Sequence, residues 1–219
     1  MIQSYKELTV AKYQEIRQII QDDGGELNIQ ARILACLNDT DLDSILNLSL
    51  SKYNELVVKS SFLLDKPKLD GRIPHRLNIN GRECEVTTNV KKLTAAQYID
   101  YQTWTSQEDQ DKYLANVLAC FVVPKGFTYG DGYDVGEIAE WLGEHLSILD
   151  ALNICFFFRK KYLESIKLTL TFLELTMKRV SRKERDPEVK GMMKELNGKL
   201  TEYRRLLQEN GDGLIRLGK

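Results

Sequence analysis

The sequence is poor in the residues that build disulfide frameworks and zinc modules. Its four cysteines, Cys36, Cys84, Cys120 and Cys155, are far apart and form no Cys-x-x-Cys pair. A secreted disulfide scaffold or a zinc module needs closely and regularly spaced cysteines. Most of these cysteines stand among apolar residues, so we interpret them as buried thiols in a reducing compartment.

Histidine is scarcer still, and no known nucleophile motif is present. The two histidines, His75 and His145, have no histidine, cysteine or aspartate at metal-ligand spacing. The chain also lacks a Gly-x-Ser-x-Gly elbow, a phosphate loop ending in Gly-Lys-Ser/Thr and a dinucleotide fingerprint after a strand. We therefore predict a protein that is not an enzyme and holds no cofactor and no metal.

An excess of one charge and a long apolar run are both missing. The chain has 31 basic and 32 acidic residues, so no overall field would hold it on nucleic acid or on an anionic membrane. The longest apolar runs, 120–123 and 154–158, are much shorter than the roughly 20 residues that cross a bilayer. The first ten residues lack the basic and apolar regions of a secretory signal. We expect a soluble protein without a membrane partner, made in the cytoplasm.

Helical periodicity covers most of the sequence and predicts a mainly α (α+β) fold. We expect a helical domain over residues 1–146 with an inserted β-hairpin. Residues 147–219 should form a second region that packs on the first as one structural unit. Within the first 65 residues four short helices are expected, and their predicted starts are Thr9, Leu27, Thr40 and Ser51.

The clearest strand signal is HRLNINGRECEV, residues 75–86, which alternates on both sides of Asn80-Gly81. Asn-Gly supplies the two positive-φ positions of a type I′ turn, so we predict a β-hairpin over about 75–87. A two-stranded ribbon is marginal alone, and its edge could pair with a strand of another subunit. The candidate inward or edge-contact residues are Leu77, Ile79, Asn80, Gly81, Cys84 and Val86.

Two helices should follow the hairpin. Thr94 and Gln97 have the spacing of a capping box, which predicts the start of the first. The second should follow Ser106, carry Phe121 on its buried face and end at Pro124.

From residue 147 the chain is almost unbroken helix former to about residue 184, and Asp186-Pro187 is typical of a new helix start. Apolar residues at three- and four-residue steps on both segments predict a long antiparallel helical hairpin over about 148–210. Leu168, Phe172 and Leu175 form an extra stripe, so one face remains to cover the rest of the domain or a neighbouring subunit. The main heptad positions are Leu163, Ile166, Leu170, Leu173, Met177, Val180, Val189, Met193, Leu196, Leu200, Tyr203 and Leu207.

A glycine-rich corner, CFVVPKGFTYGDGYDVGE, occupies residues 120–137. Its aspartates are three residues apart, which does not fit the alternating ligands of a calcium-binding loop. Asp134 and Glu137 instead predict a capping pair that starts a helix, with glycines supplying turn conformations. The tyrosines are either folded onto the core or offered to a partner. The candidate corner and interface residues are Pro124, Tyr129, Gly130, Asp131, Gly132, Tyr133, Asp134 and Glu137.

A basic cluster lies at the expected tip of the helical hairpin, with five cations against one acid over residues 178–185. It could meet phosphate or an acidic patch of a partner. The simpler interpretation is a solvated helix end whose cations favour the helix dipole. A weak contact with nucleic acid is left open only here. The cations are Lys178, Arg179, Arg182, Lys183 and Arg185.

Three stretches carry a resemblance to known proteins: LTAAQYIDYQTW (93–104), LACFVVPKGFTYGDGYDVGEIAEWL (118–142) and LDALNICFFF (149–158). Their most distinctive pieces are 97–100, 123–126 and 129–133. The chain resembles a group encoded among the virion and tail genes of tailed phages that infect Bacteroides, including crAss-like phages. The likeness covers about the middle third directly, and the amino-terminal helices agree only in pattern.

This resemblance implies a non-enzymatic structural role in the neck or tail of a virion. The leading expectation is a head-to-tail connector or tail ring component that contacts copies of itself in a ring, and the portal or other neck and tail proteins. The alternative is a tail assembly chaperone that holds another tail protein and leaves before maturation. An enzyme acting on nucleotide or peptidoglycan is the third, and it would need a pocket joining Asp131, Asp134, Glu137 and His145.

Overall fold

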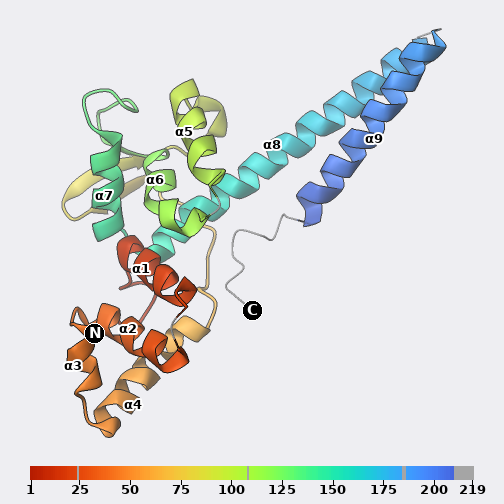
Figure 1. Ribbon diagram of the computed structural model, residues 1–219. Helices are drawn as coiled ribbons and strands as arrows, with labels where there is room; N and C mark the ends of the chain where they lie inside the picture. The colour runs from red at the N-terminus through yellow and green to blue at the C-terminus, as the bar shows by residue number, and fades with distance from the viewer. Residues whose placement is uncertain (24, 108, 184–185, 210–219) are drawn as a thin grey trace. The chain divides into compact units, whose positions relative to one another are not determined.

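The computed structural model describes residues 1–23, 25–107, 109–183 and 186–209 and confirms a mainly α fold with one small antiparallel sheet (Figure 1). The chain divides into two compact units, residues 1–157 and 158–219. We call the first the body and the second the hairpin unit. The division falls within a long helix, later than the boundary expected between residues 146 and 147.

The helices and strands follow one another in this order. They are α1 (Val10–Gln21), α2 (Glu26–Asn38), α3 (Leu42–Leu46), α4 (Leu50–Lys59), η1 (Ser60–Leu64), β1 (Arg76–Ile79), β2 (Arg82–Val86), η2 (Val90–Lys92), α5 (Ala95–Thr105), η3 (Gln110–Tyr113), α6 (Leu114–Ala119), β3 (Val122–Pro124), α7 (Val135–His145), α8 (Ile148–Lys183) and α9 (Pro187–Glu209).

The four amino-terminal helices form as expected, but two of their caps differ from the prediction. Thr9 caps α1, with its side-chain oxygen 3.4 Å from the amide three residues on. The cap of α3 is Asp41 rather than Thr40, and that of α4 is Ser49 rather than Ser51. Both observed caps have extended backbone and accept from the amide three residues on, which is the geometry that satisfies a free amide of the first turn.

A small apolar cluster holds α2, α3 and α4 together. Its buried members are Ala31, Leu34, Ala35 and Ile45, and side chains from α4 pack against it. The helices are short and would be marginal alone, so this shared burial is what stabilises them.

The predicted hairpin is present, and it gains a third strand that the sequence did not reveal. Asn80 and Gly81 have φ of 45° and 80°, as a type I′ turn requires. β2 also pairs antiparallel with β3, which gives the strand order β1-β2-β3. The helix expected from Ser106 to Pro124 was therefore wrong at its end: α6 stops at Ala119 and the chain continues into β3.

The starts of α1 and α8 are joined by main-chain hydrogen bonds. The amide of Val10 donates to the carbonyl of Leu146 at 3.0 Å, and the amide of Ile148 donates to the carbonyl of Leu8 at 2.8 Å. All four side chains are buried. The segment that leads into α1 is thus bonded to the α7–α8 junction within the body.

The first turns of α8 belong to the body core, which explains where the units divide. Ala151 and Ile154 are fully buried, and the side-chain oxygen of buried Asn153 accepts from the amide of Gly71 at 3.1 Å. In the hairpin unit the rest of α8 and the returning α9 form the expected helical hairpin (Figure 1). Among the described helices, none is long and apolar enough to cross a membrane.

Candidate functional site

The glycine-rich corner is a tightly bonded connection between β3 and α7. The amide of Phe127 donates to the carbonyl of Pro124 at 3.1 Å, and the amide of Asp131 donates to the carbonyl of Thr128 at 2.9 Å. Gly130 and Gly132 have φ of 71° and 79°, the left-handed values expected from the sequence.

Gly132 is needed for space as well as for conformation. A Cβ atom at this position would lie 3.0 Å from two ring atoms of Phe127, closer than side chains normally approach. At Gly130 the corresponding space is open. The corner is therefore shaped by packing around Phe127 in addition to backbone geometry.

Asp134 ends the corner and starts α7, as predicted. Its carboxylate accepts from the amides of Gly136 at 2.6 Å and Glu137 at 3.2 Å. Glu137 thus takes part through its backbone, whereas the described hydrogen bonds include none from its side chain back to Asp134. Asp134 acts as a helix-start residue here, because its Oδ1 accepts from two main-chain amides.

Tyr129 connects the corner to α5 and is not presented to solvent as a free contact. Its hydroxyl donates to Asp100 Oδ2 at 2.7 Å. Burial, and then this hydrogen bond, raise the pKa of the Tyr129 hydroxyl. Beside it, Gln97 donates to the carbonyl of Cys120 at 3.0 Å from within the predicted capping box of α5, which is confirmed. Burial raises the pKa of the Cys120 thiol to about 12.

Tyr133 also turns inward. Its ring meets Phe127 edge to face with centroids 6.0 Å apart, and its hydroxyl oxygen is buried without a well-aligned hydrogen bond. Burial raises the pKa of Tyr133, and the nearby Gly130 amide acts against that rise. The exposed aromatic residue of the corner is Phe127, with 51 % of its surface accessible. The sequence-based candidates were the tyrosines and did not include Phe127.

A half-open cleft of about 350 Å³ joins the corner to the hairpin. β2 of the hairpin pairs with β3, which leads into the corner. The candidate residues of the hairpin and those of the corner, which are separate in the sequence, therefore form one surface. Within it Lys125 and Glu83 form an ion pair. The lining residues are Arg82, Glu83, Pro124, Lys125, Phe127, Gly132, Tyr133, Asp134, Glu137 and Ile138.

This cleft does not gather the residues that the enzyme alternative requires. Asp134 and Glu137 line it, while Asp131 and His145 are not among its lining residues. His145 instead lies 3.4 Å from the Asn80 side chain at the hairpin turn. Among the described residues, no group of three histidine, cysteine, aspartate or glutamate side chains is placed to hold a metal ion.

The outer strand β1 has one free backbone edge. Ile79 pairs with Arg82 and Leu77 with Cys84, and in this ladder the alternate residues Arg76 and Asn78 direct their peptide groups away from β2. The described residues provide no hydrogen-bond partner for these outward groups. Of the residues predicted as inward or edge contacts, Ile79, Cys84 and Val86 are buried and Leu77 is half-buried. Cys84 and Val86 lie on the central strand β2, which pairs on both sides and has no free edge.

Pro124 lies in β3, the edge strand on the other side of the sheet, where a proline can be accommodated. Pro124 lies opposite Cys84, and the hydrogen bonds to β2 come from its neighbours, including Lys125 N to Glu83 O at 2.9 Å. A proline lacks an amide hydrogen, so it fits at an edge position that faces away from the ladder. Pro124 is therefore a strand residue rather than the helix terminator we predicted.

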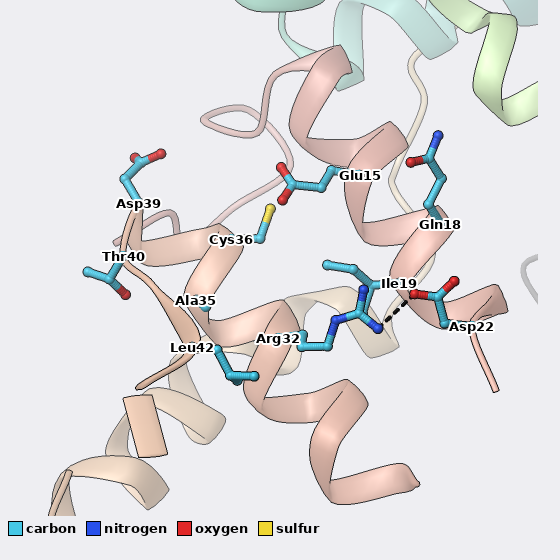
Figure 2. Close-up of a pocket in the computed structure, with 10 residues that line it drawn as sticks. All are labelled: Glu15, Gln18, Ile19, Asp22, Arg32, Ala35, Cys36, Asp39, Thr40 and Leu42. Atoms are coloured by element: carbon cyan, nitrogen blue, oxygen red, sulfur yellow. Dashed lines mark ion pairs between the residues drawn. The ribbon is translucent and has the colours of Figure 1, made fainter. Parts of the chain in front are cut away.

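A second cleft, which the sequence did not indicate, lies between α1 and α2 and has a volume of about 420 Å³ (Figure 2). Three of its lining residues are acidic, Glu15, Asp22 and Asp39, and an ion pair crosses it between Arg32 and Asp22 at 2.7 Å. The lining residues are Glu15, Gln18, Ile19, Asp22, Arg32, Ala35, Cys36, Asp39, Thr40 and Leu42.

The thiol in this second cleft is poorly suited to nucleophilic chemistry. Burial, followed by the nearby carboxylate of Glu15, raises the pKa of Cys36 to about 12. The reactive form of cysteine is the thiolate, so a thiol with a raised pKa is a weak nucleophile at neutral pH. Figure 2 shows Glu15 and Cys36 pointing toward one another from the two helices.

The basic cluster lies partly beyond what the structure describes. Lys178, Arg179, Arg182 and Lys183 fall in the last turns of α8, and the side chain of Arg179 is exposed. The side chains of the other three, and Arg185 as a whole, lie outside the described residues. The positions on α8 agree with the predicted helix end, and the proposed contact stays a prediction.

The hairpin unit exposes large apolar side chains. Phe172 and Leu175, from the extra stripe, are 68 % and 54 % accessible. Leu173 and Leu196 were expected between the two helices but are 41 % and 52 % accessible, whereas Leu170 is buried. The side chains of Leu163, Ile166, Leu168, Val180, Met193, Tyr203 and Leu207 lie outside the described residues.

No protein-family model, curated protein sequence or solved structure matches this chain.

Proposed function

We propose that this chain is a non-enzymatic structural protein of a phage virion, a head-to-tail connector or tail ring component that assembles as a cyclic oligomer. The sequence motifs that carry the resemblance support it, because they meet in space. Gln97 and Asp100 of the first stretch contact Cys120 and Tyr129 of the second. The resembling residues therefore maintain one folded unit around the corner, with their polar atoms used for structure.

The observation that carries the proposal is the exposed apolar surface of the hairpin unit. Exposing apolar surface to water costs about 25 cal/mol for each Å², so clustered residues of this kind usually mark a protein interface. Because α8 ends at Lys183 and α9 starts at Pro187 and runs back along it, Phe172 and Leu175 on α8 lie at about the same height as Leu196 and Met192 on α9. Packing against another copy would remove this surface from water.

A ring places a geometric condition on the contacts between copies. If β1 paired with β1 of another copy, the same residues would meet about a twofold axis and form a closed dimer. A ring with more than two copies needs two different surfaces that meet repeatedly around the axis. The free edge of β1 can therefore contribute to a ring only if it pairs with a segment other than β1 of the next copy.

Quantitative mass spectrometry of purified virions tests the proposal. The expected result is the presence of the chain at a fixed copy number that matches a cyclic symmetry. Absence from mature particles, with abundant chain in infected cells, would exclude a virion component.

A tail assembly chaperone is the second candidate, and the amino-terminal helices favour it. Leu27, Leu50, Val58 and Leu64 are all more than 70 % accessible, so this part of the body also offers apolar surface. A chaperone would co-purify with one tail polypeptide from infected cells and be missing from virions. The double substitution Leu50→Ser with Val58→Ser should then weaken that co-purification without changing the folded body.

A further inference from the structure

One edge of the three-stranded sheet is exposed and the other is covered. The strand order β1-β2-β3 leaves β1 and β3 at the edges. All residues of β3 are buried. In β1, Arg76 and Asn78 are exposed, and their outward peptide groups have no hydrogen-bond partner among the described residues. Of the described strands, β1 is therefore the one that offers an edge to another chain.

The edge of β1 carries little of the protection that edge strands usually have. Natural edge strands are blocked by bulges, by inward-pointing charges, by lysine or by proline. β1 pairs with β2 in an unbroken register, so it has no bulge. Its charged side chain, Arg76, alternates with the inward Leu77 and lies 3.8 Å from Glu85 on the outer face. Pro74, which lacks an amide hydrogen, precedes the strand and limits an added strand to residues 76–78.

This edge is complementary to itself in one register. Arg76 and Asn78 both direct their peptide groups outward, so in an antiparallel pair of two β1 strands Arg76 lies opposite Asn78 of the second copy. The two residues exchange a pair of main-chain hydrogen bonds, and the twofold axis repeats that pair. The axis passes between Leu77 of one copy and Leu77 of the other.

The side chains agree with this register. Leu77 is half-buried, and the pairing places it against Leu77 of the second copy at a non-hydrogen-bonded position, where side chains are closest. On the outer face, Arg76 meets an uncharged Asn78. The register centred one residue earlier would place Arg76 against Arg76 of the second copy, which is unfavourable. The register centred one residue later would place Arg76 against Asn80, which lies in the turn with a φ of 45°.

We propose that β1 of one copy pairs antiparallel with β1 of a second copy and forms a closed twofold dimer in which the two sheets become continuous. A second copy fits better than an unstructured segment, because an ordered strand on each side avoids the entropy cost of fixing a loose chain. The contact is separate from the packing of hairpin units proposed for the ring. Because it covers residues 76–78 of each copy, it is small, and the dimer should form at high protein concentration.

Disulfide cross-linking of the full-length chain tests the register directly. The Cα atoms of a non-hydrogen-bonded antiparallel pair are about 4.5 Å apart, within the range that a disulfide spans. Leu77→Cys should therefore give a cross-linked dimer under mild oxidation. His75→Cys is the control at an exposed residue of the same segment. In the proposed register its two copies lie about 14 Å apart along the strands, so it should cross-link no more than the wild-type chain.

A proline at an outward amide tests the hydrogen bonds without a new thiol. The amide of Arg76 points away from β2, so Arg76→Pro removes it without loss of a bond to β2. Each copy then loses one hydrogen bond to the other, and self-association in sedimentation velocity should weaken about tenfold or more. Arg76→Ala keeps the amide and should stay within about twofold of wild type. Circular dichroism of each variant checks that the fold is kept.

Two results would overturn the pairing. One is equal cross-linking of Leu77→Cys and His75→Cys. The other is an Arg76→Pro variant that keeps its fold and associates as strongly as wild type, which would assign any self-association to another surface. These measurements use the isolated chain and do not depend on its presence in virions, so the pairing and the proposed function fail separately.

Discussion

The body has a large buried core, whereas most of the apolar side chains that the structure describes in the hairpin unit are half-buried or exposed. In the body, Phe121, Leu142 and Ile154 are almost completely buried. In the hairpin unit, Phe172 and Leu196 keep more than half of their surface in contact with water. The body has a core of its own, whereas two helices alone leave much of their apolar surface uncovered. Folding stability and assembly should therefore depend on different units.

Polar contacts differ in the same way. Side chains in the body tie segments far apart in the sequence, as Tyr129 does with Asp100 and Arg17 does with Asp111 at 2.7 Å. In the described part of the hairpin unit, Lys199 and Glu195 form a local ion pair one helical turn apart. Local pairs on a helix stabilise it by only about 0.2–0.5 kcal/mol each.

The largest contrast should come from removing one phenylalanine in each unit. Phe121→Ala creates a cavity at a fully buried position and should lower the free energy of unfolding by about 3–5 kcal/mol. Phe172→Ala, at an exposed position, should change it by less than about 0.5 kcal/mol in the monomer but weaken self-association. Urea denaturation and sedimentation velocity measure the two effects. Equal losses of stability would contradict the division between the units.

The corner should be the next most sensitive part of the body. Gly132→Ala combines a left-handed backbone with a close approach to Phe127 and should cost about 2 kcal/mol or more. Gly126→Ala is the control, because its φ is also positive at 87° while its Cβ space is open. It should cost less, about 1–2 kcal/mol. If thermal denaturation finds the two equal, packing against Phe127 does not shape the corner.

The cap of α7 should make a smaller contribution. Asp134→Ala leaves two main-chain amides without their acceptor and should cost about 1 kcal/mol, within a range of about 0.5–2. Asp134→Asn keeps an acceptor and should recover most of the loss. An unchanged urea midpoint for the alanine variant would show that solvent replaces the cap.

The pH dependence of stability at alkaline pH should show a smaller effect, which comes from Tyr129 in the body. The pKa of Tyr129 is raised in the folded state, so its contribution is present below its unfolded value of about 10 and is lost as pH rises through the folded value. Stability should therefore fall above about pH 10, and Tyr129→Phe should remove part of that fall. Tyr98→Phe, at an exposed position, is the control. Identical pH slopes for wild type and Tyr129→Phe would refute the assignment.

Local signals in the sequence predicted local structure well. The Thr9 and Asp134 caps, the Thr94–Gln97 capping box and the Asn80-Gly81 turn all form as expected. Each depends on residues within a few positions of one another. The caps of α3 and α4 are Asp41 and Ser49 instead of the predicted Thr40 and Ser51. Serine, threonine and aspartate are nearly equivalent as helix caps, and a short helix has too few periodic apolar residues to show which candidate is the cap.

Distant pairings could not be predicted from the same signals. Val122 and Val123 read as the end of a helix, because a short apolar run does not distinguish a buried helix from a buried strand. Their pairing with β2, far away in sequence, decides the outcome. The Tyr129–Asp100 hydrogen bond likewise depends on how α5 meets the corner. No local signal in the sequence could decide whether the tyrosines fold onto the core or face a partner.

Native mass spectrometry of the full-length chain tests the central claim most directly. A cyclic assembly predicts one closed oligomer of fixed copy number for the wild-type chain. A chain that stays monomeric at all concentrations would contradict it.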